Sequence, residues 1–154
     1  MNLRHGLSAL GLLVLLGACA APAPPPPTRI SGQIEAATPL NPGPGGGSLP
    51  LRVRLYELKN PGTFQCADFF SVWDNPQAKL GADLLGTEDY TLQAGARQPF
   101  ERTLDPQARY VGFVAAYRDL NGAVWRQSLA VPANQTTRLR VQAGTKTLSV
   151  GAGQ

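Results

Sequence analysis

Hydrophobic and polar positions alternate along most of this chain, and the alternation predicts about eight β-strands. The clearest case is residues 51–56, where leucine and valine alternate with arginine; residues 29–36 show a weaker version of the same pattern. Further strands are predicted at residues 90–93, 100–104, 110–117, 124–131, 137–142 and 145–150. Short strands at such regular spacing are typical of an antiparallel β-sandwich. We therefore expect an all-β fold.

Residues 110–117 are apolar on both faces, which predicts a central strand covered from both sides. The pair Asn121-Gly122 that follows is a strong hairpin signal and leads into residues 124–131. Ala143-Gly144 is expected to form the turn between the last two strands.

The period changes between residues 61 and 85, where a short helical insertion is predicted at 63–85. Thr63 can cap a first helix, and Pro76 suits the first turn of a second helix that ends near Gly81. We expect two short helices on the rim of a sheet.

Residues 38–50 contain four prolines and four glycines, so no regular element is expected there. A long loop inside a compact domain is usually either functional or disordered. Leu40 and Leu49 are candidate apolar anchors at its base, although both can equally pack on the edge of the sandwich.

The N-terminal residues 1–18 read as a secretory signal. An apolar run from Leu7 follows a short basic region and is too short to span a bilayer, which needs about 20 apolar residues. The run closes on Leu16-Gly17-Ala18-Cys19, a lipobox that predicts cleavage and acylation of Cys19, although the small residues also suit a plain signal peptidase site. Ala20, in place of an inner-membrane retention aspartate, favours a lipid anchor on the periplasmic face of the outer membrane.

Residues 19–28 then comprise the lipidated cysteine and a proline-rich tether, expected to adopt extended polyproline II. The remaining residues 29–154 are enough for one sandwich domain. The net charge of +4 in 154 residues is too weak to indicate nucleic acid as a partner.

Candidate chemistry is sparse. The single histidine, His5, lies in the signal, which excludes histidine-based catalytic triads and histidine metal sites from the mature chain. With Cys19 committed to lipid, Cys66 is expected to be a small buried hydrophobe. Glu88-Asp89, near Asp83, offers paired carboxylates, but adjacent strand residues point to opposite faces.

Other distinctive residues have structural explanations. Residues 119–122 faintly resemble a calcium loop, but a hairpin turn accounts for them. The aromatic residues expected in the core are Phe69, Phe70, Trp73, Phe113 and Trp125. Four outward arginines are expected to form a solvated face, with acidic lipid, peptidoglycan or an acidic partner as alternatives: Arg52, Arg54, Arg138 and Arg140.

A series of short segments carries a resemblance to a known family. These are Leu40-Asn41-Pro42, residues 51–58, Phe64 with residues 67–70, residues 80–85, residues 112–119 and Trp125-Arg126. In order and spacing, from the lipobox to the last strand, the series resembles TssJ, the outer-membrane lipoprotein of type VI secretion systems.

The resemblance implies a transthyretin-like β-sandwich with a small helical insertion, anchored in the inner leaflet of the outer membrane. It implies a non-enzymatic assembly protein, without catalytic residues, metal, cofactor or small-molecule substrate, that binds the periplasmic C-terminal domain of the inner-membrane protein TssM. The partner-binding loop maps onto residues 38–50, with Leu40, Asn41, Pro42 and Leu49 as its expected contacts. This chain departs from the family pattern at Gly45-Gly46-Gly47 and at Cys66.

Two other classes of function remain open from the sequence. One is a periplasmic lipoprotein that holds peptidoglycan or lipid on a sandwich face, which an aromatic-lined groove would favour. The other is a hydrolase that uses carboxylates alone, which convergent carboxylates with raised pKa values would favour.

Overall fold

The computed structural model describes residues 19–153, and the predicted signal at residues 1–18 lies outside the described part. Its strands are β1 (Arg29–Ala36), β2 (Leu51–Leu58), β3 (Leu84–Leu92), β4 (Arg97–Thr103), β5 (Tyr110–Ala115), β6 (Arg126–Ala130), β7 (Thr136–Ala143) and β8 (Leu148–Ala152). Its helices are α1 (Gly62–Cys66), α2 (Phe69–Asp74), α3 (Pro76–Leu80) and a 3₁₀ turn, η1 (Gly81–Asp83). None of the helices in residues 19–153 is long and apolar enough to cross a membrane.

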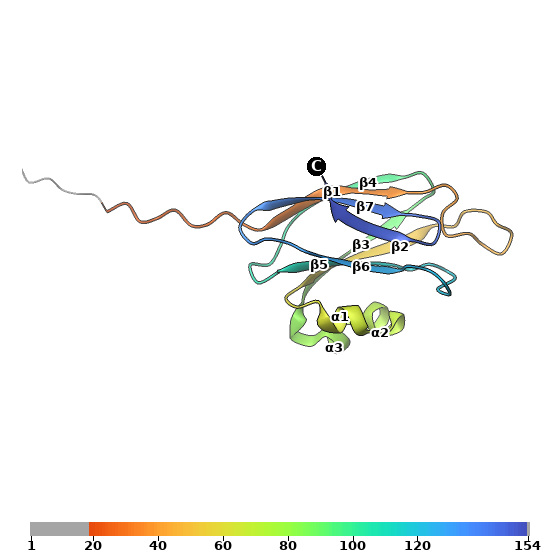
Figure 1. Cartoon of the computed structure of the whole chain (residues 1–154), viewed down its shortest axis with the longest axis horizontal. Coiled ribbons are helices and arrows are strands. Elements are labelled where there is room, and N and C mark those ends of the chain that lie inside the picture. Colours follow the sequence, from red (N-terminus) through yellow and green to blue (C-terminus); the bar gives the residue numbers. More distant parts are fainter. Residues whose placement is uncertain (1–18, 154) are drawn as a thin grey trace, which may run out of the picture.

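The strands form two four-stranded sheets that face each other (Figure 1). Sheet A has the order β4-β1-β7-β8 and sheet B the order β3-β2-β5-β6. This confirms the predicted β-sandwich with a short helical insertion. One pair departs from the antiparallel expectation, because β1 runs parallel to β7. The local pattern of each strand could not show this, since the two strands are far apart in the chain.

The main core lies between the two sheets and is built by the alternation seen in the sequence. Ile30 and Ile34 of β1 face Val53 and Leu55 of β2, and all four are fully buried. Gly32 shares their face, where an added Cβ would lie 2.9 Å from the Phe100 ring and would overlap the Leu139 carbonyl oxygen. The absence of a side chain at this position therefore lets β1 lie against β7 beneath the Phe100 ring.

A second core covers the outer face of sheet B, where the helices pack (Figure 1). Tyr56 of β2 is fully buried and its hydroxyl donates to the Val72 carbonyl of α2 at 2.7 Å. The Phe64 ring of α1 occupies the space above Gly112, where an added Cβ would lie 2.5 Å from the ring. β5 and the second half of β2, from Leu55 to Leu58, are therefore buried on both faces. The prediction of a central, covered strand at 110–117 is confirmed for residues 110–115.

The helical insertion is shorter and more divided than predicted. It contains three short α-helices instead of two, and it ends at Asp83, since β3 begins at Leu84. Pro76 stands in the first turn of α3, as predicted. Thr63 does not cap α1; Asp68 caps α2 instead, accepting a hydrogen bond from the Ser71 N–H at 3.0 Å.

Two expectations about burial are wrong. Cys66 is exposed, because the five-residue helix α1 turns only Phe64 into the core. Phe70 is 65% exposed at the surface of α2, whereas Phe113 is fully buried as predicted. Phe69, Trp73 and Trp125 are partly buried in one aromatic cluster, in which Phe69 stacks on Trp73 and meets Trp125 edge-on.

The sandwich has two ends, which we call the tether pole and the loop pole. Residues 19–27 are exposed and extend away from the tether pole (Figure 1). Thr28 is buried where the tether enters the fold, and its hydroxyl accepts the Asn134 N–H at 2.9 Å. β1 then runs the length of sheet A into the loop of residues 38–50, which projects from the opposite end (Figure 1).

Candidate docking site at the loop pole

The base of the loop at residues 38–50 is held by two buried residues. Leu40 is fully buried in the main core and Asn41 is 6% exposed, with a positive φ of 45° that asparagine tolerates better than most residues. The Asn41 side-chain amide donates to the Pro50 carbonyl at 2.9 Å, and its carbonyl oxygen accepts the Arg118 N–H at 2.8 Å. Asn41 therefore fastens both ends of the loop to the neighbouring segment.

Hydrogen bonds also run across the loop itself. The Leu40 N–H donates to the Ser48 hydroxyl at 2.9 Å, and the Leu49 N–H donates to the Leu40 carbonyl at 3.0 Å. Nearer the tip, the Gly43 N–H donates to the Gly47 carbonyl at 2.8 Å. No regular element forms, as predicted, yet the loop has a defined path. Its exposed residues are 38–39 and 44–50, among which Leu49 is 38% exposed.

Two other connections pack beside the loop. The Thr145 hydroxyl donates to the Pro39 carbonyl at 2.8 Å, and the Arg118 guanidinium donates to the Pro42 carbonyl at 3.2 Å. Lys146 in turn donates to the Asp119 carboxylate at 2.9 Å and to the Asn121 carbonyl at 2.8 Å. Residues 116–122 and 144–147 thus support the loop from one side.

A small hollow of about 110 Å³ lies between the loop and this support. Its lining is Asn41, Pro42, Gly43, Tyr117, Arg118, Asp119 and Lys146. The hydrogen bond from Lys146 lowers the pKa of Asp119, and burial raises the pKa of Tyr117 to about 12. Both groups keep fixed charge states near neutral pH, so the hollow presents a static polar surface.

Of the three carboxylates that the sequence offered for catalysis, Glu88 and Asp89 form ion pairs, and Asp83 accepts a hydrogen bond from the Asn60 side-chain amide at 2.8 Å. Asp89 binds the guanidinium groups of Arg52 and Arg54, and the hydrogen bond from Arg54 is the main cause of its lowered pKa. Glu88 points the other way and pairs with Arg102 at 2.9 Å. Within residues 19–153, no group of three histidine, cysteine or acidic residues is placed to hold a metal ion.

Arg102 has a second partner that the sequence gave no reason to expect. Glu57 is 3% exposed and accepts a hydrogen bond from Arg102 of β4 and another from the Asp105 N–H at 2.8 Å. Because Glu57 belongs to sheet B and Arg102 to sheet A, this buried pair joins the two sheets at their β3–β4 side.

The structure separates the predicted site residues by their exposure. Cys19 is exposed and is the first residue of the tether, which leaves the sandwich at the end opposite the loop (Figure 1). At the loop, Leu40 and Asn41 are buried, Pro42 is half-buried and Leu49 is exposed. No pattern in the sequence connects Arg118, Thr145 or Lys146 to the loop. The Asn121-Gly122 signal correctly places a turn in that segment, but not its contact with a loop more than 70 residues earlier.

A two-sheet sandwich with helices on one sheet and a hydrogen-bonded loop at one pole matches one class of solved structures. Residues 28–146 match the family model described as "Type VI secretion lipoprotein, VasD, EvfM, TssJ, VC_A0113". The chain belongs to this family of type VI secretion lipoproteins. No curated protein matches the chain.

Three solved structures illustrate the similarity. The T6SS lipoprotein TssJ1 from Pseudomonas aeruginosa is 46% identical with a TM-score of 0.81, over 84% of this chain and 98% of that one. Serratia marcescens Lip, a membrane-bound component of the type VI secretion system, is 27% identical with a TM-score of 0.76, over 83% and 99%. A chain from a structure described as the T6SS protein TssM C-terminal domain from EAEC is 23% identical with a TM-score of 0.64, over 80% and 98%, and shows the shared fold.

Proposed function

We propose that this chain is the outer-membrane lipoprotein of a type VI secretion membrane complex. In this proposal, acylated Cys19 holds the protein to the periplasmic face of the outer membrane. The loop of residues 38–50 binds the periplasmic C-terminal domain of the inner-membrane protein TssM. The chain acts as an assembly component and not as an enzyme.

The observation that carries the proposal is the position of the loop relative to the tether. Residues 19–27 leave one end of the sandwich and residues 38–50 project from the other (Figure 1). A chain attached to lipid at Cys19 would therefore present the loop on its far side, toward the periplasm. Membership of the secretion lipoprotein family supports the same assignment.

The loop is suited to binding because much of its ordering is complete before a partner arrives. Fixing a free backbone residue costs about 1–2 kcal/mol, which docking must offset. Asn41 and Ser48 already hold the loop across its base, and Gly43 bonds to Gly47 near the tip. The exposed Leu49 and the glycine-rich tip then offer an apolar side chain beside accessible backbone.

The test is a shortened loop. Replacing residues 42–48 by a two-residue Asn-Gly turn should leave the sandwich folded, with a Tm within a few degrees of the parent. Binding to the periplasmic domain of TssM, measured by calorimetry, should fall by at least about tenfold. Phe70→Ala, which removes an exposed aromatic side chain from the helical face, is the matched control and should bind normally. If the shortened-loop variant binds TssM unchanged and Phe70→Ala loses binding, the docking surface is on the helices and the proposal is wrong.

The anchor has a separate test. Cys19→Ser should abolish palmitate incorporation and release the protein from the outer-membrane fraction. A Cys19→Ser chain that still incorporates palmitate would contradict the proposed anchor.

A further inference from the structure

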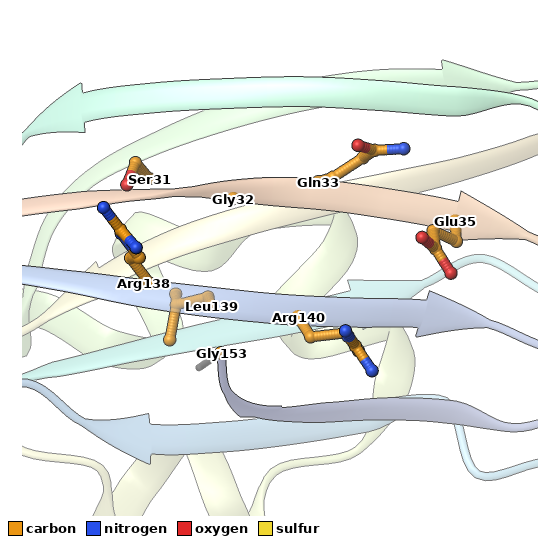
Figure 2. A pocket seen from close by; sticks show the side chains of 8 residues that line it. All are labelled: Ser31, Gly32, Gln33, Glu35, Arg138, Leu139, Arg140 and Gly153. Atoms are coloured by element: carbon orange, nitrogen blue, oxygen red, sulfur yellow. The ribbon is translucent and has the colours of Figure 1, made fainter.

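The outer face of sheet A carries a shallow hollow between β1 and β7, with a volume of about 300 Å³ (Figure 2). Ser31 and Gln33 of β1 and Arg138 and Arg140 of β7 line this hollow; the Arg138 guanidinium lies between the two strands, whereas Gln33 extends toward β4 and Arg140 toward β8 (Figure 2). We call these four residues the arginine face. The register aligns Ser31 with Arg138 and Gln33 with Arg140 across the two strands.

The arginine face holds positive charge that is not neutralised within the protein. Among residues 19–153, neither Arg138 nor Arg140 forms an ion pair or donates a side-chain hydrogen bond. Of the acidic residues on this sheet face, Glu101 already pairs with Arg29 at 3.5 Å. Glu35 lines the hollow beside Arg140 but lies outside ion-pair distance of it. The two guanidinium groups are therefore free to bind an external anion.

The position of this charge differs from that of the other paired arginines. Arg52 and Arg54 share Asp89 on the helical side of the molecule, and both stack over the Trp73 ring. By contrast, β7 runs parallel to β1, so both strands start at the tether pole. Arg138 is the third residue of β7 and lies opposite Ser31, the third residue of β1. Because β1 directly follows the tether, Arg138 lies near the tether pole.

We propose that the arginine face binds the phosphate groups of anionic phospholipids in the membrane to which the tether leads. Guanidinium groups bind phosphate oxygens with paired hydrogen bonds, and the Ser31 hydroxyl adds a neutral donor near Arg138 (Figure 2). The inference rests on the proposed function in one respect, namely that Cys19 anchors the protein to a membrane. It adds that the tether-side half of sheet A lies against the lipid, whereas the helices on sheet B face away.

A membrane surface fits the arginine face better than a peptidoglycan strand does. A glycan or stem peptide needs walls that enclose it. This hollow is an open depression on a sheet, lined by seven residues of β1 and β7 and by Gly153 near the C-terminus (Figure 2). A lipid surface needs only accessible positive charge close to the anchor. The ten residues 19–28, extended at about 3.1 Å per residue, allow the sheet to reach the headgroups.

The first experiment measures membrane binding without the acyl anchor. All eight strands and both cores lie within residues 29–152, so the chain from residue 19 with Cys19→Ser contains the complete fold. It should co-sediment at low salt with vesicles of equal parts phosphatidylethanolamine and phosphatidylglycerol, and not with phosphatidylcholine vesicles. Arg138→Gln with Arg140→Gln should weaken the binding by about 25-fold, which is about fivefold for each arginine near an anionic surface.

The control removes the same charge elsewhere. Lys59 and Lys79 are exposed and form no ion pair within the described residues, and both belong to the segment that precedes β3 on the side of the helices. Lys59→Gln with Lys79→Gln should change vesicle binding by less than about twofold. Equal losses in the two double variants would overturn the proposal, because net charge alone would then explain them. Arginine-dependent co-sedimentation with isolated peptidoglycan, with no vesicle binding, would overturn it in favour of the other ligand.

The second experiment reports orientation in the acylated protein. A fluorophore on Thr136→Cys, in a Cys66→Ser background, should be quenched by a headgroup-attached quencher in phosphatidylglycerol vesicles, and Arg138→Gln with Arg140→Gln should abolish the quenching. The same fluorophore on native Cys66, which is exposed on the helical side, should not be quenched. Protein that floats with the vesicles but shows no quenching at residue 136 would contradict the proposed lipid binding by the arginine face and leave the Cys19 anchor standing. Protein that does not float would contradict the anchor, and the acyl-free experiment would still decide the inference.

Discussion

The Asn41 side-chain oxygen accepts the backbone N–H of Arg118 at 2.8 Å, although the two residues are 77 positions apart. The same amide group donates to the Pro50 carbonyl at 2.9 Å. One buried side chain therefore connects the first and last parts of the projecting loop to the connection after β5. The shape of the loop depends on this residue more than on its glycine-rich tip.

Asn41→Ala should destabilise the domain by about 2–4 kcal/mol, because it leaves buried backbone groups unpaired and places alanine at a positive φ. Asn134→Ala is the matched control: Asn134 also has a positive φ, of 61°, but is exposed. Urea unfolding measures the loss of stability in both variants, and the difference between them is the contribution of the Asn41 side-chain hydrogen bonds. Equal losses of stability would show that Asn41 contributes only its conformation.

Substitution of Leu40 should affect stability, whereas substitution of Leu49 should affect binding. Leu40→Ala opens a cavity in the main core and should cost about 2–5 kcal/mol. Leu49→Ala, at a 38% exposed position, should cost less than about 1 kcal/mol but weaken binding to the TssM periplasmic domain. Denaturation and calorimetry of the two variants measure both effects. Normal binding by Leu49→Ala would exclude this side chain from the interface.

Gly112→Ala should destabilise the domain by about 1–3 kcal/mol, because the new methyl group would lie 2.5 Å from the Phe64 ring and push α1 off sheet B. Adding Phe64→Leu should restore part of this loss, since a smaller side chain frees the space. Gly32→Ala should be at least as damaging and should not be relieved by Phe100→Leu, because the methyl group also meets the Leu139 backbone. Thermal unfolding of the two double variants tests this difference.

The ion pairs of Asp89 predict a dependence of stability on pH. Folding lowers the Asp89 pKa, chiefly through the hydrogen bond from Arg54, so this contribution is present above the unfolded value of about 3.9 and is lost as the pH falls through the folded value. The Asp89 side chain is 38% exposed, and solvent screening limits the contribution to about 0.5–1 kcal/mol. The difference in unfolding free energy between the parent and Asp89→Asn should be present at pH 7 and vanish near pH 2. A difference that stays constant over this range would contradict the assignment.

Cys66→Ser should change stability by no more than about 0.5 kcal/mol, because the thiol is exposed at the end of α1. Binding to the secretion partner should be unchanged. Chemical denaturation and calorimetry check both points, and loss of binding in a folded variant would show a role for the thiol.

The parts of the fold predicted from the sequence are those that local patterns determine. Alternation places Leu51, Val53 and Leu55 inward because one face of a strand is buried, and this pattern needs no knowledge of the partner strand. Tyr56 breaks the alternation, and its burial under Val72 could not be read from the strand alone. The parallel pairing of β1 with β7 and the Glu57–Arg102 pair likewise depend on contacts between distant segments.

The sequence predicts that an irregular loop stands at residues 38–50, but not how the loop is held. Proline and glycine content identifies the loop at residues 38–50, whereas the burial of Leu40 follows from how the loop closes over the end of the core. Cys66 is expected to be buried because cysteine is usually a buried residue type, but it is exposed. Helix α1 is only five residues long and turns one side chain, Phe64, toward sheet B.

The route of the chain through β1 has a mechanical consequence. β1 begins where the tether ends and leads directly into the projecting loop, and it is bonded to β4 on one side and to β7 on the other. A pulling force between Cys19 and a partner held at the loop would act along this one strand. Such a load shears two rows of hydrogen bonds together and cannot open them one at a time from an edge. The most direct line of tension through the molecule therefore follows a strand in the interior of its sheet.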